Sequence, residues 1–137
     1  MATKNAMIAR TGLAVAVMLG AGLVAGTASA QAISYTDVQA TQGATAYGAS
    51  CARCHGAQAQ GAEAPSLTGA QFDGSWRGGP VKDLFDFISQ YMPEDKPGIL
   101  AKDVYVTIVA HLLKINGIPG GATALANPPP AGILIPK

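Results

Sequence analysis

Apolar side chains recur with a helical period at two places in the second half of the chain. The first set occupies positions i, i+3, i+4 and i+7: Val81, Leu84, Phe85 and Ile88. The second set repeats this spacing: Tyr105, Ile108, Val109 and Leu112. Side chains spaced in this way fall on one face of an α-helix. The pattern therefore predicts two amphipathic helices, each with one face turned toward a core.

Residues that start and stop helices set the ends of both segments. Pro80 stands at a first helical position, and Pro93 disfavours helical geometry in the residue before it, so one helix should reach about residue 91. The other helix should begin near Asp103, whose carboxylate suits the positive end of the helix dipole. It should end before Gly117, which is suited to capping it.

An earlier helix is predicted by a capping motif rather than by periodicity. Thr36 and Gln39 form a capping box, so a helix over about 37–50 should follow. From 56 to 79 glycine recurs with few apolar periods, which predicts a loop. Residues 122–137 contain three consecutive prolines and no periodic pattern, which predicts an extended tail. No strand pattern is evident, so the fold class should be all-α, with three main helices and long loops.

The N-terminal segment has the order of a secretory signal. Lys4 and Arg10 precede an uncharged run that ends in the small residues Ala28-Ser29-Ala30. We therefore predict a signal peptide over 1–30, which is removed on export, followed by a domain over 31–121 and the tail. An uncleaved membrane anchor is the alternative, because the uncharged run approaches the length that spans a bilayer.

Removal of this segment would change the charge of the chain. The full sequence has 9 Lys and Arg against 8 Asp and Glu. Without Lys4 and Arg10, seven basic residues face eight acidic ones, and the net charge is −1. That balance argues against nucleic acid or an acidic membrane surface as the partner. Aromatic residues form only 6% of the chain, so a domain of this size has a limited core unless a buried cofactor adds to it.

The candidate chemistry lies in the pentapeptide Cys51-Ala52-Arg53-Cys54-His55, which contains both cysteines of the chain. CxxCH is the attachment signature of c-type haem: the thiols add to the two vinyl groups, and the histidine is held under the iron. A redox-active CxxC disulfide is one alternative, but no alternating strand and helix units follow it. Zinc is the other, but it needs four ligands, and the rest of the mature chain offers only one further histidine.

A second iron ligand is predicted in the loop between the last two helices. Met92 is the only methionine outside the predicted signal peptide, and Pro93 and Pro97 stiffen its loop. Methionine more often fills a core, but beside a haem motif in an exported protein iron ligation is the preferred interpretation. His111 is the rival ligand, although its place beside two leucines in a helix is typical of a residue that packs between helices.

Further residues complete a pattern around the CxxCH and Met-Pro elements. They are Gly43, Tyr47, Gly56, Pro65, Leu67, Phe72, Trp76, Pro97-Gly98 and Ala110-His111-Leu112-Leu113. With them, the stretch from Tyr35 to Gly121 resembles a class I cytochrome c, and it is similar to small cytochromes and cytochrome domains that accept electrons from quinoprotein dehydrogenases. The resemblance implies one covalently bound haem c, with the CxxCH histidine as proximal ligand and the loop methionine as distal ligand. One departure is His111, where the family commonly has tyrosine.

The resemblance also implies roles for two residues outside these motifs. The carbonyl of Pro65 would accept a hydrogen bond from the ring of His55, with an ordinary turn proline as the alternative. The indole of Trp76 would reach a haem propionate, with plain packing as the alternative. Gly43 and Tyr47 lie one turn apart, and we expect them to form the close crossing of the first and last helices.

The predicted ligand pair limits the chemistry of the iron. With histidine on one side and methionine on the other, no position is vacant for a substrate, which leaves one-electron transfer. We therefore expect a periplasmic electron carrier, or the cytochrome subunit of a dehydrogenase, and not an enzyme in its own right. The expected donor is a quinoprotein dehydrogenase, and the acceptor is a terminal oxidase or another cytochrome. Membrane contact is expected only if the N-terminal segment is retained. The alternative is a haem enzyme or sensor, in which Met92 is labile or absent from the iron and peroxide or a gas binds there.

Overall fold

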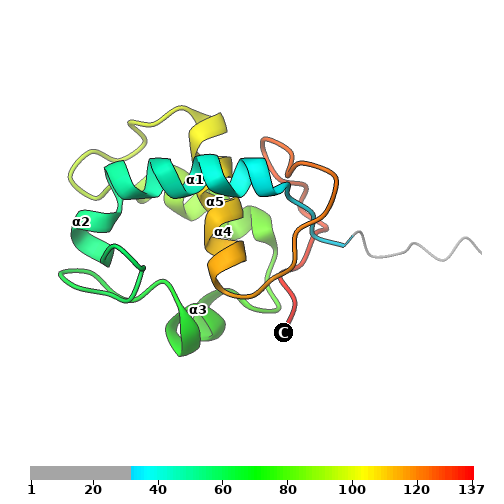
Figure 1. Ribbon diagram of the computed structural model, residues 1–137, viewed down its shortest axis with the longest axis horizontal. Coiled ribbons are helices and arrows are strands. Elements are labelled where there is room, and N and C mark those ends of the chain that lie inside the picture. Colours follow the sequence, from blue (N-terminus) through cyan, green and yellow to red (C-terminus); the bar gives the residue numbers. More distant parts are fainter. Residues whose placement is uncertain (1–31) are drawn as a thin grey trace, which may run out of the picture.

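The computed structural model describes residues 32–137, so the predicted signal peptide lies outside the described residues. Within this range the chain forms five helices, and the only β-type pairing is an isolated bridge between Pro80 and Leu134. The helices are α1 (Asp37–Ser50), α2 (Ala52–His55), α3 (Gly69–Trp76), α4 (Val81–Tyr91) and α5 (Lys102–Ile115) (Figure 1). The all-α fold class is confirmed. None of these helices has both the length and the apolar character needed to cross a membrane.

The three predicted helices are confirmed as α1, α4 and α5. At the start of α1 the hydroxyl of Thr36 accepts a hydrogen bond from the backbone nitrogen of Gln39 at 3.1 Å, as a capping box requires. The predicted loop over 56–79 is wrong in part, because α3 lies within it. Phe72 is the one buried residue of α3, and so short a helix shows no apolar period.

α1 crosses α5 at close range (Figure 1). A β-carbon at Gly43 would lie 1.9 Å from the carbonyl oxygen of Thr107, so only glycine fits there. One turn further on, the ring of Tyr47 packs against the ring of His111, with 5.3 Å between the centroids. The expected role of Gly43 and Tyr47 in the helix crossing is confirmed. The missing side chain lets the two backbones approach each other.

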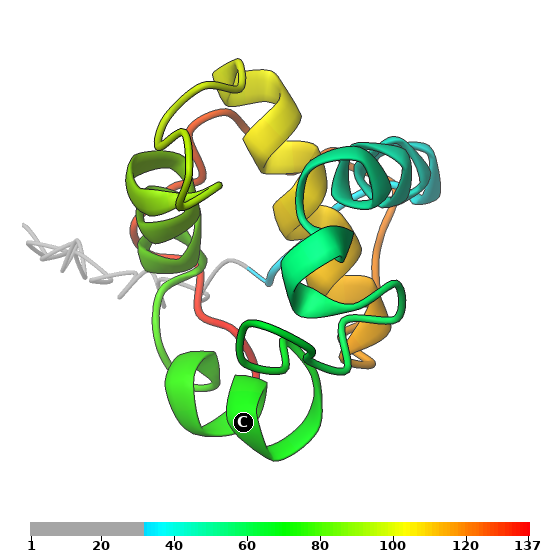
Figure 2. The ribbon, with the colours of Figure 1, turned by 90° about the vertical axis from the view of Figure 1, so that its left-hand side faces the viewer.

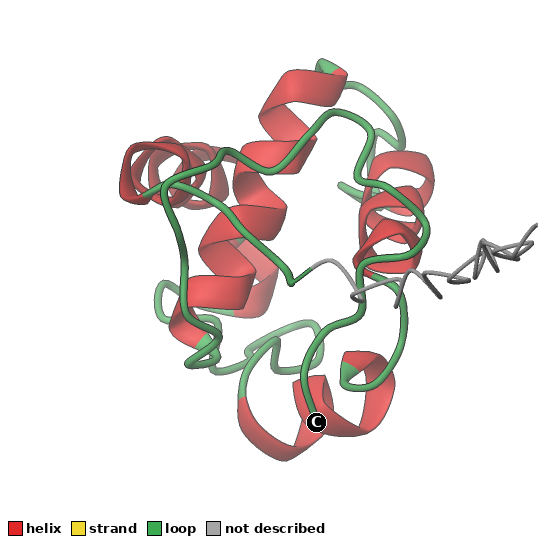
Figure 3. Cartoon of the chain, turned by 90° about the vertical axis from the view of Figure 1, so that its right-hand side faces the viewer, coloured by secondary structure: helices red, strands yellow, loops and turns green. Residues whose placement is uncertain are grey.

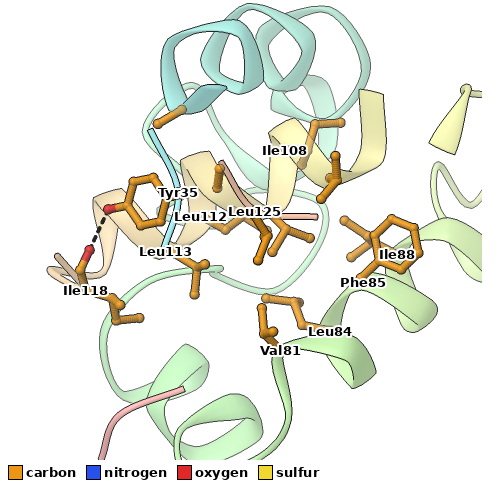
Figure 4. Packing of buried hydrophobic residues seen from close by; sticks show 14 of the residues in the cluster. Tyr35, Val81, Leu84, Phe85, Ile88, Ile108, Leu112, Leu113, Ile118 and Leu125 are labelled. Carbon is orange, nitrogen blue, oxygen red and sulfur yellow. Dashed lines mark hydrogen bonds between the residues drawn. The ribbon is translucent and has the colours of Figure 1, made fainter. Parts of the chain in front are cut away.

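Part of the core lies where α4 and α5 face each other. Figure 4 shows the buried side chains that the two helices direct toward each other there: Leu84, Phe85, Ile88, Ile108 and Leu112. Figure 2 shows α4 on one side of the domain, α1, α2 and α5 on the other, and α3 at one end. The C-terminal ends of α2 and α4 therefore lie on opposite sides of the domain.

The C-terminal segment 122–137 has no helix, but it packs into the core. Ile135 is fully buried, and its backbone nitrogen donates to the carbonyl oxygen of Gly79 at 2.9 Å. The backbone nitrogen of Val81 donates to the carbonyl oxygen of Ile133 at 2.9 Å. This bond satisfies an N–H group in the first turn of α4 that has no partner within the helix. Figure 3 shows the segment running beside α4, which it helps to hold in place.

Candidate functional site

A cavity of about 430 Å³ opens between α2, α4 and α5. All six residues that the sequence predicts for the site line it: Cys51, Cys54, His55, Pro65, Trp76 and Met92. The remaining wall is mainly apolar, and its larger side chains are Tyr47, Leu67, Phe72, Leu84, Phe87, Ile88, Leu100, Tyr105, Ile108 and Leu112. The fold thus brings together two motifs that lie far apart in the sequence.

α2 follows α1 directly and carries the CxxCH residues. The backbone nitrogen of Cys51 donates to the carbonyl oxygen of Tyr47 at 2.8 Å, so Cys51 lies at the joint between the two helices. Positions three apart in helical geometry share a face, and both Cys51 and Cys54 line the cavity. Gly56, with a φ of 85°, ends α2, and its carbonyl accepts a hydrogen bond from the hydroxyl of Tyr47 at 2.8 Å. Contacts with α1 therefore fix both ends of the motif.

A backbone carbonyl orients the ring of His55. Nδ1 of His55 lies 2.8 Å from the carbonyl oxygen of Pro65. Because a carbonyl only accepts, Nδ1 carries the hydrogen, and Nε2 keeps the lone pair that a metal ligand needs. The structure thus contains the contact that the resemblance implies. Iron ligation by His55 stays a prediction.

The surroundings of the two thiols do not favour the disulfide and zinc alternatives. Burial raises the pKa of the Cys51 thiol to about 11, and the neighbouring Cys54 adds to the rise. At neutral pH this thiol is protonated, unlike the reactive cysteine of a CxxC oxidoreductase. Within residues 32–137 no strand accompanies the motif, and no group of three or more His, Cys, Asp or Glu side chains gathers to hold a metal ion.

Met92 caps the C-terminal end of α4 and is the only methionine in the described part of the chain. Its side chain is partly buried, and it lines the cavity. Its backbone nitrogen donates to the carbonyl oxygen of Ile88 at 3.0 Å. Because α2 and α4 lie on facing sides of the domain (Figure 2), the residues that end them, His55 and Met92, reach the cavity from facing elements.

His111 lies away from this cavity. It packs against Tyr47 in the crossing of α1 and α5, and it is not one of the residues that line the cavity. Burial lowers the pKa of His111, and the nearby charge of Lys114 lowers it further. These surroundings support the interpretation of His111 as a residue that packs between helices.

The sequence interpretation missed two aromatic side chains of the cavity wall, Phe87 and Tyr105. Phe87 packs between Trp76 and Tyr91, with centroid distances of 5.5 and 5.3 Å. A second apolar row on α4, formed by residues 84, 87 and 91, is the sequence signal that indicates this contact. Trp76 therefore packs against an aromatic ring and also borders the cavity. For Tyr105 the sequence indicates only a place on the apolar face of its helix.

The edge of the cavity carries opposite charges. A guanidinium nitrogen of Arg53 on α2 lies 3.4 Å from a carboxylate oxygen of Asp95 in the loop after α4. The two side chains are 75% and 56% exposed, so this ion pair contributes little to stability. It does connect the CxxCH helix to the Met92 loop across the cavity edge.

The donor set fits a covalently bound haem. Two thiols, a histidine nitrogen with a free lone pair and a thioether all line one apolar-walled cavity in an all-α domain. A fold and site of this kind define a c-type cytochrome of class I. A family model described as cytochrome c oxidase, cbb3-type, subunit III matches residues 38–112, which is more than half of the chain, and the chain belongs to this family. No significant match was found among curated proteins or solved structures. Membership in this family implies haem c and electron transfer.

Proposed function

We propose that this protein transfers single electrons through one haem c, bound covalently by Cys51 and Cys54 and coordinated by His55 and Met92. The supporting observation is that these four residues line one cavity with mainly apolar walls. When bound, the haem supplies an Fe(III)/Fe(II) couple whose potential is higher with a thioether ligand than with two histidines.

The residues around the ligands have distinct tasks in this proposal. The carbonyl of Pro65 holds the hydrogen on Nδ1 of His55, so Nε2 is available to the iron before the cofactor arrives. Phe72 and Leu84 exclude water from the cavity. Trp76 lines the cavity and is proposed to donate its indole N–H to a haem propionate. If His55 and Met92 both bound the iron, no coordination position would be left for peroxide or a gas, so the proposed role is that of a carrier rather than an enzyme.

The proposal includes export to the periplasm through the signal peptide over 1–30. The donor, a quinoprotein dehydrogenase, is proposed from the sequence resemblance alone. The matched family is described as an oxidase subunit, which supports a terminal oxidase as acceptor, with another cytochrome as the second choice. A free carrier and a bound subunit of a dehydrogenase differ in partner affinity, so purification from the native host without added detergent would distinguish them.

The first test is whether haem is present and covalently held. Purified mature protein should keep its haem through extraction with acidic acetone, because thioether bonds survive this treatment. Its reduced-minus-oxidised visible spectrum should then be that of a c-type haem. Haem that leaves with the solvent would contradict the proposal.

The second test compares Met92→Ala with His111→Phe. Met92→Ala should lower the reduction potential, abolish the weak sulfur-to-iron charge-transfer band of the ferric protein, and open the iron to imidazole or cyanide. His111→Phe should keep the band and change mainly stability, because it replaces one ring in a helix contact by another. If only His111→Phe removed the sixth ligand, the iron would have two histidine ligands. If the unmodified protein bound a gas readily at the iron, because Met92 is absent from the iron or easily displaced, the enzyme or sensor alternative would be supported.

A further inference from the structure

The loop 92–100 carries Met92, and both of its ends are hydrogen-bonded to the hydroxyl of one buried tyrosine. The hydroxyl of Tyr105 on α5 donates a hydrogen bond to the carbonyl oxygen of Met92, with 2.5 Å between the oxygens. It also accepts a hydrogen bond from the backbone nitrogen of Leu100 at 3.4 Å. A phenol has one hydrogen to donate and lone pairs to accept with, so a single side chain serves both ends of the loop 92–100. Tyr105 is 1% exposed, and its ring lines the cavity.

The other bonds that shape this loop are local or exposed. The backbone nitrogen of Lys96 donates to the carbonyl oxygen of Pro93 at 2.9 Å, which forms a turn inside the loop. Residues 94–99 are exposed. The ion pair between Arg53 and Asp95 is exposed at both ends. Compared with these contacts, Tyr105 is a buried side chain on another helix, and its part-buried hydrogen bonds to the loop are costly to break without replacement.

We propose that Tyr105 is a positioning residue that holds the backbone of Met92 in the place from which its sulfur reaches the iron. The inference rests on the proposed coordination by Met92. When the thioether leaves the iron, the loop backbone must move, and that movement breaks the hydrogen bond from Tyr105. The hydroxyl therefore favours the bound state of Met92 and opposes entry of a foreign ligand. The net contribution of one hydrogen bond corresponds to about a two- to tenfold effect on that equilibrium.

Tyr35 provides a matched control. Its hydroxyl donates to the carbonyl oxygen of Ile118, also at 2.5 Å, and its side chain is 2% exposed. Both bonds run from the hydroxyl of a buried tyrosine to a backbone carbonyl, and they differ in that the Tyr35 bond is buried whereas the Tyr105 bond is part-buried. Tyr35 does not line the cavity. Tyr35→Phe thus reports the general cost of losing a buried tyrosine hydroxyl.

The test measures imidazole binding to the ferric holoprotein in the unmodified form, Tyr105→Phe, Tyr35→Phe and Met92→Ala. Tyr105→Phe should keep the sulfur-to-iron band and bind imidazole about two- to tenfold more tightly than the unmodified protein. Tyr35→Phe should lower the unfolding midpoint but leave the imidazole affinity unchanged. Equal imidazole affinities in Tyr105→Phe and Tyr35→Phe would overturn the proposal.

Met92→Ala separates this inference from the function on which it rests. If Met92→Ala keeps the band and the original imidazole affinity, Met92 is not the ligand, and both proposals fail. If Met92→Ala loses the band while Tyr105→Phe behaves like Tyr35→Phe, only the role of Tyr105 fails.

A second measurement keeps the proposal testable if Tyr105→Phe does not take up haem. In the unmodified holoprotein, saturating imidazole should speed hydrogen exchange at the amide of Leu100, because the loop leaves the hydroxyl that accepts its hydrogen bond. The amide of Ile135, bonded to Gly79 at 2.9 Å, should keep its rate. An unchanged rate at Leu100 would show that Met92 leaves the iron without releasing Tyr105, and the proposal would be wrong.

Discussion

Replacing Gly43 with alanine should destabilise the protein, although alanine is the better helix former. The new β-carbon would lie 1.9 Å from the carbonyl oxygen of Thr107 and 3.0 Å from the β-carbon of His111. Ordinary contact begins near 3.4 Å, so α1 and α5 would have to separate by about 1.5 Å. The obstructing atom belongs to the backbone and has no rotamer through which to move away.

The expected magnitude combines two opposing effects. Overpacking a well-packed contact costs about 1–3 kcal/mol, and more where the backbone must shift. Replacing a helical glycine with alanine gains about 0.5–1 kcal/mol. Because the clash at Gly43 is with backbone, we expect the upper end of the cost and a net loss of about 2 kcal/mol. In a domain of this size that loss lowers Tm by about 8–16 °C.

Gly48 on the same helix provides the control. A β-carbon there meets nothing within 4 Å, so Gly48→Ala should show only the gain in helix propensity, about 0.5–1 kcal/mol. Thermal unfolding of the haem-loaded proteins, followed by circular dichroism, measures both variants. A Gly43→Ala protein as stable as Gly48→Ala would refute the close approach of α1 and α5.

Three further predictions concern the site and its surroundings. Cys51→Ser and Cys54→Ser should each leave at most one thioether and little stable holoprotein on a haem-stained denaturing gel; zinc bound by the unmodified protein and lost in the double variant would favour the zinc alternative. Asp95→Asn should change the free energy of unfolding in guanidinium by less than about 1 kcal/mol, since the pair with Arg53 is exposed; a larger loss would show that the pair is a principal tether of the loop. Burial holds the pKa of His111 below 6.5, so the unfolded chain binds more protons there, and stability falls as the pH drops through about 6.5. His111→Phe should make unfolding midpoints less dependent on pH between about 7 and 5, and an unchanged dependence would contradict this assignment.

The helices that the sequence predicts are those whose signals are local. α4 and α5 each repeat an apolar spacing over two turns, and α1 begins at a capping box formed by neighbouring residues. α3 escapes prediction because it directs one buried side chain, Phe72, toward the core and is rich in residues typical of loops. A single contact has no period, so only the folded chain reveals such a helix.

The packing of the C-terminal segment could not be predicted for a different reason. Ile133 and Ile135 follow a proline-rich stretch, and their backbone partners, Val81 and Gly79, lie more than fifty residues earlier. No spacing within the segment specifies that pairing. The pairing uses backbone groups at the start of α4, among them an N–H group that has no partner within the helix, and these groups are properties of the folded chain.

The candidate site likewise contains residues with a local sequence signal and residues whose role depends on the folded chain. Haem attachment restricts chemistry to a few residue types at fixed spacing, so the roles proposed for Cys51, Cys54 and His55 can be predicted from the sequence alone. Holding a loop in place requires only a donor that reaches a carbonyl, and many residue types on many elements could supply one. Tyr105 therefore has no motif of its own, and in the sequence it is one more apolar position on α5. Residues that do chemistry can be recognised by their amino-acid type and spacing, whereas residues that position them can be recognised only in the tertiary structure. A search for further positioning residues therefore has to begin from the hydrogen bonds of the Met92 loop.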